Sequence, residues 1–289
     1  MSDLPIRDAA TVLSLRERAG SVEVYMVKRN SRMGFLGGRH VFPGGAVDAA
    51  DSGAAAAALF HGVDPQQAGA VLAIDDHARA RGFLVAAARE LYEEAGILLA
   101  INEAGAWVDL DADDARASSL CAERPNVAAG DTDFATLLAS HGLRLAADRL
   151  AHFAHWITPD VEKKRFDTHF FIAPAPAAQS ADHDRTESTE GSWMTSAQAL
   201  ARYQAREIEL VPPTIATLEW VARFSNVDDA MAAAHAEQVV AILPKIIMGD
   251  ELVILYPGDC DYESGVPAPI AGRTANRLVV RDGLWERPQ

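Results

Sequence analysis

The chain has 289 residues, of which 49% are hydrophobic and 23% charged. This composition is typical of a globular protein and excludes a chain that is disordered throughout. Its 26 Lys and Arg residues face 41 Asp and Glu residues, and the resulting net charge of -15 repels nucleic acid and anionic membranes, so we expect neither as a partner.

Three further features of the sequence bear on its location. No apolar run approaches the ~20 residues of a membrane helix, and the first residues lack the pattern of a signal peptide. The two cysteines, Cys121 and Cys260, cannot form a disulfide framework and lack the spacing of zinc ligands. We expect both to be inert and the protein to be cytoplasmic.

The first hundred residues predict a hairpin followed by a helix. Apolar and β-branched residues predict strands at 9–17 and 22–27, joined by a turn at 19–21. The glycine-rich stretch 34–45 predicts irregular backbone. Residues 52–80 predict one or two short helices, and residues 82–95 predict a helix that Gly96 ends.

The remaining residues predict alternating helices and strands. Residues 97–149 look mostly helical, with turns near Gly105, Pro125 and Gly130, and residues 174–191 form a long polar loop of the kind that often carries function. We expect strands at 152–157, 169–173, 252–255 and 278–280, and helices at 196–204, 212–224 and 228–238. The simplest architecture is one compact α/β domain with insertions and a C-terminal extension.

Three glutamates share one face of the helix expected at 82–95. Each residue advances ~100° along a helix, so Glu90, Glu93 and Glu94 lie within an arc of about 100°. At ~6 Å and an effective dielectric constant of ~20, each pair repels by about 3 kcal/mol. An enclosed face therefore needs a cation or raised pKa values, and Mg²⁺ prefers such oxygen ligands. Arg89 can pair with Glu93 four residues later. A solvated acidic face is the alternative.

A pair of glycines precedes this helix in the chain. Gly44 and Gly45 follow Phe42 and Pro43, and they leave the backbone carbonyls unobstructed by side chains. A carbonyl here could complete an oxygen coordination sphere, although a tight turn is an equally good reading of two glycines.

These segments resemble the Nudix box, G-x5-E-x7-R-E-U-x-E-E-x-G-U, where U is a bulky aliphatic residue. Residues 89–97 match its second half without exception, and Gly45 fits its first glycine. Asp51 stands where the family has Glu, which keeps the carboxylate but shortens it. Residues 52–88 occupy the place of seven residues in the family's box.

An interrupted box is a feature of one subgroup that the chain resembles, the peroxisomal-type acyl-coenzyme A diphosphatases. Coenzyme A-directed members carry an upstream motif, L-L-T-x-R-(S/A)-x3-R-x3-G-x3-F-P-G-G. Arg29, Gly38 and residues 42–45 fall on its spacing. Asn30 and Gly34 depart from it, and Arg32 or Arg39 could replace the missing second arginine.

The resemblance implies a fold and a domain organisation. The fold is an α/β/α sandwich with a mixed sheet. Residues 1–225 would form the Nudix domain, with an insertion at about 52–80 inside the box and a helical insertion at about 98–149. Residues 226–289 would form a C-terminal extension packed on the same domain, although the similarity says little about this part.

The resemblance also implies a metal site. Mg²⁺ or Mn²⁺ would be held by Glu90, Glu93 and Glu94 beside the Gly45 carbonyl. The polar loop would add a further acidic ligand, for which we rank Glu190 ahead of Glu187. Glu93 or Glu90 would act as the general base, and Arg89 completes the catalytic set.

The implied substrate is coenzyme A or acyl-coenzyme A, which would give 3',5'-ADP and 4'-phosphopantetheine. The expected substrate-binding residues are Arg29, Gly38, Phe42, Arg39 and Arg165. An ADP-ribose or NADH diphosphatase is the alternative within the same reaction class, and a non-catalytic ligand-binding regulator is the alternative outside it.

For a few other residues, a structural role is the simpler interpretation. His152 and His155 are three residues apart on an expected strand, so they would face opposite sides and form no metal pair. We expect Trp193 and Phe166 to pack in the core rather than stack on adenine. The C-terminal residues show no Ser-Lys-Leu-type peroxisomal address. The oligomeric state stays open, with a homodimer as one option.

Overall fold

The computed structural model describes residues 5–32, 36–265 and 275–288. Gly34, which departs from the coenzyme A motif, lies outside these residues. Strands β1 (Ile6–Arg18) and β2 (Ser21–Arg29) form the predicted hairpin. Ala19 and Gly20 join them with φ values of 50° and 77°. This pair of positive φ angles matches the right-handed twist of hairpin strands. Both strands are longer than the sequence predicts.

The central sheet is mixed and contains eight strands. Its order is β10-β7-β8-β1-β2-β3, with β4 paired to β1 and β9 paired to β2. β1 runs parallel to β8 and antiparallel to β2. The other strands of the sheet are β3 (His40–Val41), β4 (Gly44–Ala46), β7 (Ala151–Ile157), β8 (Arg165–Pro174), β9 (Ser188–Thr195) and β10 (Ala241–Ile242).

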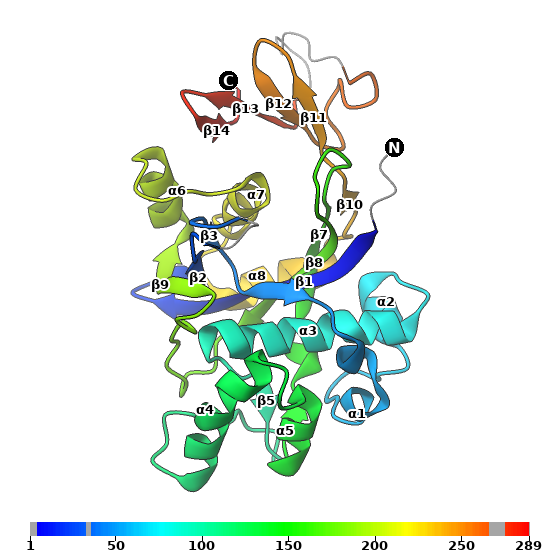
Figure 1. Cartoon of the computed structure of the whole chain (residues 1–289), viewed down its shortest axis with the longest axis vertical. Helices are drawn as coiled ribbons and strands as arrows, with labels where there is room; N and C mark the ends of the chain where they lie inside the picture. The colour runs from blue at the N-terminus through cyan, green and yellow to red at the C-terminus, as the bar shows by residue number, and fades with distance from the viewer. Residues whose placement is uncertain (1–4, 33–35, 266–274, 289) are drawn as a thin grey trace.

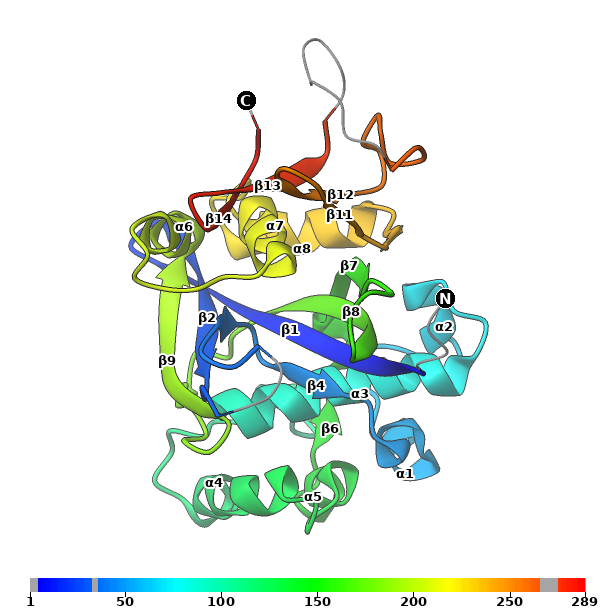
Figure 2. The same ribbon diagram turned by 45° about the horizontal axis from the view of Figure 1, so that its top comes forward.

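Helices cover both faces of this sheet, which agrees with the α/β/α sandwich that the resemblance to the Nudix family implies (Figures 1 and 2). Side chains alternate along β1, so that Ala10 and Val12 pack toward α3 (His77–Ala95), while Leu13 and Leu15 pack toward the opposite layer. That opposite layer consists of α6 (Ser196–Gln204), α7 (Pro212–Val221) and α8 (Val227–Ala236).

The helix α3 is the long element on which the candidate site depends. It begins at His77 rather than at the predicted residue 82, because Asp76 caps it and accepts hydrogen bonds from the amides of Ala78 and Arg79 at 3.0 Å each. Gly96 ends it in the left-handed conformation with φ 68°, as the sequence predicts. A run of buried alanines brings the helix close to the sheet.

The two insertions lie on the α3 side of the sheet. A 3-10 turn (Ala49–Ser52) leads into the insertion inside the box, which contains α1 (Ala54–Ala57) and α2 (Ala68–Leu72), in agreement with the predicted short helices. The second contains β5 (Ala100–Ile101), α4 (Ala115–Ala128), α5 (Phe134–Ser140), β6 (Arg144–Leu145) and a 3-10 turn (Ala147–Arg149). Pro125 lies inside α4 and does not mark the predicted turn.

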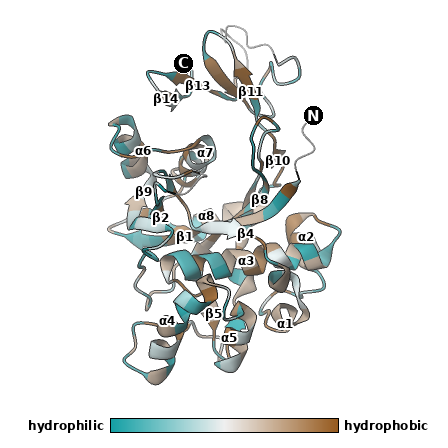
Figure 3. Cartoon of the chain, viewed as in Figure 1, coloured by the Kyte–Doolittle hydropathy of each residue, from teal (hydrophilic) through white to brown (hydrophobic). Residues whose placement is uncertain are grey.

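The C-terminal residues add a second, four-stranded sheet. It contains β11 (Lys245–Met248), β12 (Leu252–Leu255), β13 (Arg277–Arg281) and β14 (Leu284–Glu286). Hydrophobic residues line these strands (Figure 3), and Ile254 and Tyr256 share a buried cluster with Trp156 of the central sheet. The ring of Tyr256 meets that of Trp156 edge-on, with 5.5 Å between centroids.

Among the described residues, no helix combines the length and the apolar character needed to cross a membrane.

Candidate metal and diphosphate site

The two halves of the interrupted box meet in space despite the residues between them. Gly45 on β4 lies against the carboxylate of Glu90 on α3, and a Cβ atom built at Gly45 would lie 2.5 Å from Glu90 Oε1. The amide of Gly44 donates a hydrogen bond to Glu94 Oε2 at 3.1 Å. Only glycine therefore allows the backbone of β4 to approach the acidic face of the helix so closely.

Arg89 organises the carboxylates from within the helix. Its Nη1 donates to Glu90 Oε1 at 2.8 Å and to Glu93 Oε1 at 3.2 Å, which includes the predicted pairing with Glu93. Its Nη2 donates to the carbonyl of Ala46 at 2.9 Å. The guanidinium thus links Glu90 and Glu93 to β4, and Arg89 is only 8% exposed.

Asp51 closes the box from the other side of the insertion. Its Oδ1 and Oδ2 accept from Arg89 Nε and Nη2 at 3.0 and 2.9 Å, and the amide of Asp48 donates to its Oδ2 at 2.8 Å. Asp51 is 3% exposed. Its carboxylate thus joins the residues that precede the insertion to Arg89 of α3, which follows the insertion. The inserted residues therefore loop out without separating the two halves of the box.

The electrostatics of this site call for a cation. Burial raises the pKa of Glu90 to about 7, with the Glu93 charge adding to the rise and Arg89 opposing it. Burial also raises the pKa of Glu93, and it raises that of Glu94 well above its usual range, with the Glu90 charge adding to the effect. Three crowded carboxylates whose charged forms are disfavoured, next to a backbone that only glycine permits, form an oxygen-rich donor set that suits Mg²⁺ or Mn²⁺.

The expected fourth carboxylate is in a different place from the one predicted. Glu190 lies in β9, opposite Lys28 of β2, and is exposed and outside the lining of the cleft. Glu187 lines the cleft, and its Oε2 lies 3.9 Å from Arg29 Nη2. The positions of the two side chains thus favour Glu187 over Glu190, because β9 begins at Ser188 and ends the polar loop earlier than predicted.

A large cleft of about 1750 Å³ opens beside these carboxylates. Three predicted substrate-binding residues, Arg29, Arg39 and Phe42, line it. Nη1 of Arg29 lies 3.9 Å from Glu94 Oε1, which places a cation beside the acidic trio. Lys164 and Arg206 add positive charge to the same walls.

Two other predicted substrate-binding residues do not line this cleft. Arg165 donates from Nε to the carbonyl of Thr158 at 3.1 Å and lines a separate pocket of about 450 Å³, so its predicted role is not supported. Side chains alternate along β8, and Phe166 faces the cleft in its place. Gly38 serves a turn, with φ 81° and its amide bonded to the carbonyl of Arg29 at 2.9 Å.

The aromatic predictions have mixed outcomes. Trp193 packs edge-on against Tyr25, with 5.3 Å between ring centroids, and carries the guanidinium of Arg16 at 4.2 Å, in agreement with a packing role. Phe166 lines the cleft instead of packing wholly in the core. Both cysteines are free and exposed.

Two contributions to the site were missed at the sequence level. Arg124 of α4 donates from Nε to the carbonyl of Glu93 at 2.9 Å and from Nη2 to that of Asp182 at 2.8 Å, which ties the end of α3 to the polar loop. The C-terminal extension supplies Ile246, Ile254 and Trp285 to the cleft wall. No local sequence pattern indicates either contribution, because both depend on how segments far apart in the chain pack together.

Comparison with known proteins agrees with this arrangement. A family profile for the NUDT19 Nudix domain matches residues 7–221. The chain belongs to this Nudix family. A crystal structure of a Nudix hydrolase from Alicyclobacillus acidocaldarius is 27% identical, superposes with a TM-score of 0.63, and covers 80% of this chain and 97% of that one.

Curated Nudix relatives point the same way. The acyl-coenzyme A diphosphatase NUDT19 of Xenopus laevis is 25% identical, and the match covers 92% of this chain and 80% of the relative. The human protein of the same name is 28% identical over 87% of this chain and 75% of its own length. The chain is thus a Nudix hydrolase of the NUDT19 subgroup, which confirms the resemblance seen in the box.

Proposed function

We propose that this Nudix hydrolase cleaves the diphosphate of coenzyme A or acyl-coenzyme A, releasing 3',5'-ADP and 4'-phosphopantetheine or its acylated form. One observation carries the proposal: Glu90 and Glu94 lie against the glycines of β4, and Arg89 holds Glu93 beside them, at the wall of a large cleft. The diphosphatase names of the relatives support the substrate class, as does the position of Arg29 beside Glu94.

Glu90, Glu93 and Glu94, with the Gly45 carbonyl, would hold Mg²⁺ or Mn²⁺. Such an ion supplies charge neutralisation on the diphosphate and lowers the pKa of bound water. The chain itself supplies the remaining functions. Glu90 or Glu93 accepts the proton of the attacking water, and Arg89 acts as a positioning residue that holds both carboxylates in place.

The cleft has walls suited to both ends of the substrate. Arg29 and Arg39 provide positive charge for phosphate oxygens. The apolar side chains of Ile246, Ile254 and Trp285 from the C-terminal extension suit the uncharged pantetheine and acyl portion. We accordingly propose that residues 226–289 belong to the same working unit as the Nudix domain at 1–225.

An ADP-ribose or NADH diphosphatase is the second candidate, since Gly34 replaces the second arginine of the coenzyme A motif. Incubation of the full chain with Mg²⁺ and each compound, followed by chromatography of the products, separates the two candidates. Production of 3',5'-ADP from coenzyme A supports the first. Turnover of ADP-ribose without turnover of coenzyme A would overturn it.

The proposed partner is a small-molecule substrate and not nucleic acid, which the net charge of -15 repels. The proposed compartment is the cytoplasm, which suits two free cysteines.

A further inference from the structure

A β-bulge gathers histidines on the face of the sheet that α3 covers. The pairing of β7 with β8 shifts between His152 and Ala154, so that His152 stands opposite Phe171 and His155 stands opposite His169. The extra residue in the bulge turns His152 and His155 to the same face of the sheet. The prediction that these two side chains face opposite sides is therefore wrong, because it assumed a regular strand.

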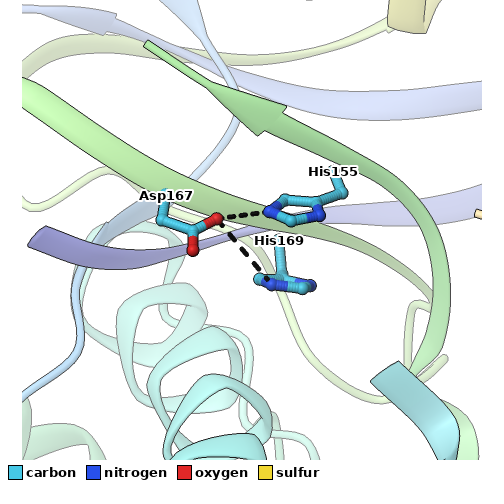
Figure 4. Close-up of side chains that lie close together, drawn as sticks. All are labelled: His155, Asp167 and His169. Carbon is cyan, nitrogen blue, oxygen red and sulfur yellow. Dashed lines mark hydrogen bonds and ion pairs between the residues drawn. The ribbon is translucent and has the colours of Figure 1, made fainter. Parts of the chain in front are cut away.

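The gathered side chains converge on one carboxylate. His155 Nε2 is hydrogen-bonded to Asp167 Oδ1, and His169 Nε2 lies 4.0 Å from the same oxygen. Figure 4 shows a nitrogen of each ring directed at Asp167. One ligand atom from each of the three residues lies within 4.8 Å of the others, which is a spacing that a single ion could bridge.

His169 provides an independent observation in favour of a bound ion. It is 1% exposed, and its Nε2 is buried with no hydrogen-bond partner. Buried polar atoms without partners are rare, because each costs the free energy of its lost hydration. This nitrogen is aimed into the cluster, where a metal ion would satisfy it.

His152 stands behind His169 and sets its orientation. His169 Nδ1 and His152 Nε2 lie 3.0 Å apart. When His169 Nδ1 donates the hydrogen of this bond, its Nε2 presents a lone pair to the cluster. An outer partner of this kind is common behind histidines that bind metals, since it fixes both the tautomer and the ring.

The charges around the cluster also favour a cation. Arg79 of α3 donates to Asp8 and to Asp167 Oδ2 at 2.7 Å each. Two carboxylates and one guanidinium leave one negative charge, and Asp167 Oδ1 stays directed at the histidines. The side chains of His155 and Asp167 are 19% and 18% exposed, so solvent reaches the edge of the cluster.

We propose that His155, His169 and Asp167 bind a zinc-type divalent ion. Two imidazoles and one carboxylate suit Zn²⁺ or Co²⁺, whereas Mg²⁺ prefers oxygen ligands throughout. None of the three residues lines the cleft. Arg79, beside the cluster, lies eleven residues before Glu90 on α3, or roughly 16 Å along the helix axis. The ion would join β7 to β8 and would be separate from the diphosphate site.

Cobalt titration of the full chain tests this proposal. The background is Glu94→Gln, which weakens the Nudix metal site, and excess Mg²⁺ occupies the remaining carboxylates. We expect about one equivalent of Co²⁺ to bind with visible ligand-field bands, and Zn²⁺ to displace it. In that background His155→Ala should weaken binding at least about tenfold. His235→Ala, at an exposed histidine of α8, should leave it unchanged.

X-ray absorption of the zinc-loaded chain gives a readout that needs no variant in the cluster. Two imidazole nitrogens in the zinc shell support the proposal. Absence of Co²⁺ binding in the Glu94→Gln background, equal binding by the His155→Ala and His235→Ala chains, or a zinc shell without imidazole would each overturn it. None of these outcomes depends on diphosphate hydrolysis, so the proposal stands or falls independently of the proposed function.

Discussion

Replacing Asp51 with Asn tests how the interrupted box is held closed. Asp51 is 3% exposed and receives two hydrogen bonds from Arg89, at 2.9 and 3.0 Å. The side-chain amide of Asn keeps the shape of Asp51 but removes its negative charge. It also places an NH2 donor near the Arg89 guanidinium, which is itself a donor. Breaking a buried ion pair costs about 3–5 kcal/mol. Because Arg89 keeps Glu90 and Glu93 as partners, we expect the free energy of unfolding to fall by about 3 kcal/mol.

Urea unfolding followed by tryptophan fluorescence measures this loss, with Asp48→Asn as the matched control. Asp48 lies 3.7 Å from the same guanidinium, but its side chain is 69% exposed, so its charge should contribute less than about 1 kcal/mol. A released Arg89 would also pull on Glu90 and Glu93, so hydrolysis should fall in the Asp51→Asn chain alone. Equal stability of the two variants would refute the role we assign to Asp51.

Three further predictions concern single residues. Glu94→Gln should lower kcat by about 10²-fold or more without loss of stability. Stability is kept because burial raises the pKa of Glu94 well above its usual range, so the amide removes a disfavoured charge. Steady-state kinetics and urea unfolding measure the two effects, and retained turnover would contradict the metal site. Arg29→Ala should raise KM for coenzyme A by 10-fold or more, the equivalent of one lost charge-assisted hydrogen bond of about 1.5–3 kcal/mol, and an unchanged KM would remove Arg29 from the substrate site. Burial lowers the pKa of His40 to about 4, so the unfolded chain takes up a proton below about pH 6.5 while the folded chain does not. The free energy of unfolding should therefore fall between pH 6.5 and 4 by up to about 3 kcal/mol. Urea unfolding at several pH values should show a flatter decline for His40→Leu, and an equally steep decline would contradict the burial argument.

The elements of the fold that local sequence patterns control were predicted well. The hairpin of β1 and β2, the helix that ends at Gly96 and the short helices of the insertion all follow from residues close together in the chain. The errors occur where a single side chain decides a boundary. Asp76 starts α3 five residues before the predicted position, and Pro125 is accommodated inside α4.

The core of the candidate site was predictable for a different reason. Helical periodicity alone places Glu90, Glu93 and Glu94 on one face, and the box pattern pairs them with Gly45. The substrate walls were predicted less well, because strand alternation turns Arg165 away from the cleft and an earlier strand start moves Glu190 out of reach. The histidine cluster was missed because a β-bulge in β7 changes which side chains share a face.

The contribution of the C-terminal extension could not be read from local patterns at all. Its strands were expected at nearly their observed positions, yet nothing in those residues says which surface they cover. Only tertiary packing brings Trp285 and Ile254 to the cleft.

Hydrolysis of coenzyme A by the full chain tests the central claim most directly. With Mg²⁺ present, we predict release of 3',5'-ADP and 4'-phosphopantetheine, loss of this release when the ion is chelated, and recovery when Mg²⁺ or Mn²⁺ is restored. Failure to cleave coenzyme A, acyl-coenzyme A, ADP-ribose or NADH under any of these conditions, by a chain shown to be folded, would contradict the assignment of Glu90, Glu93 and Glu94 to a working diphosphatase site.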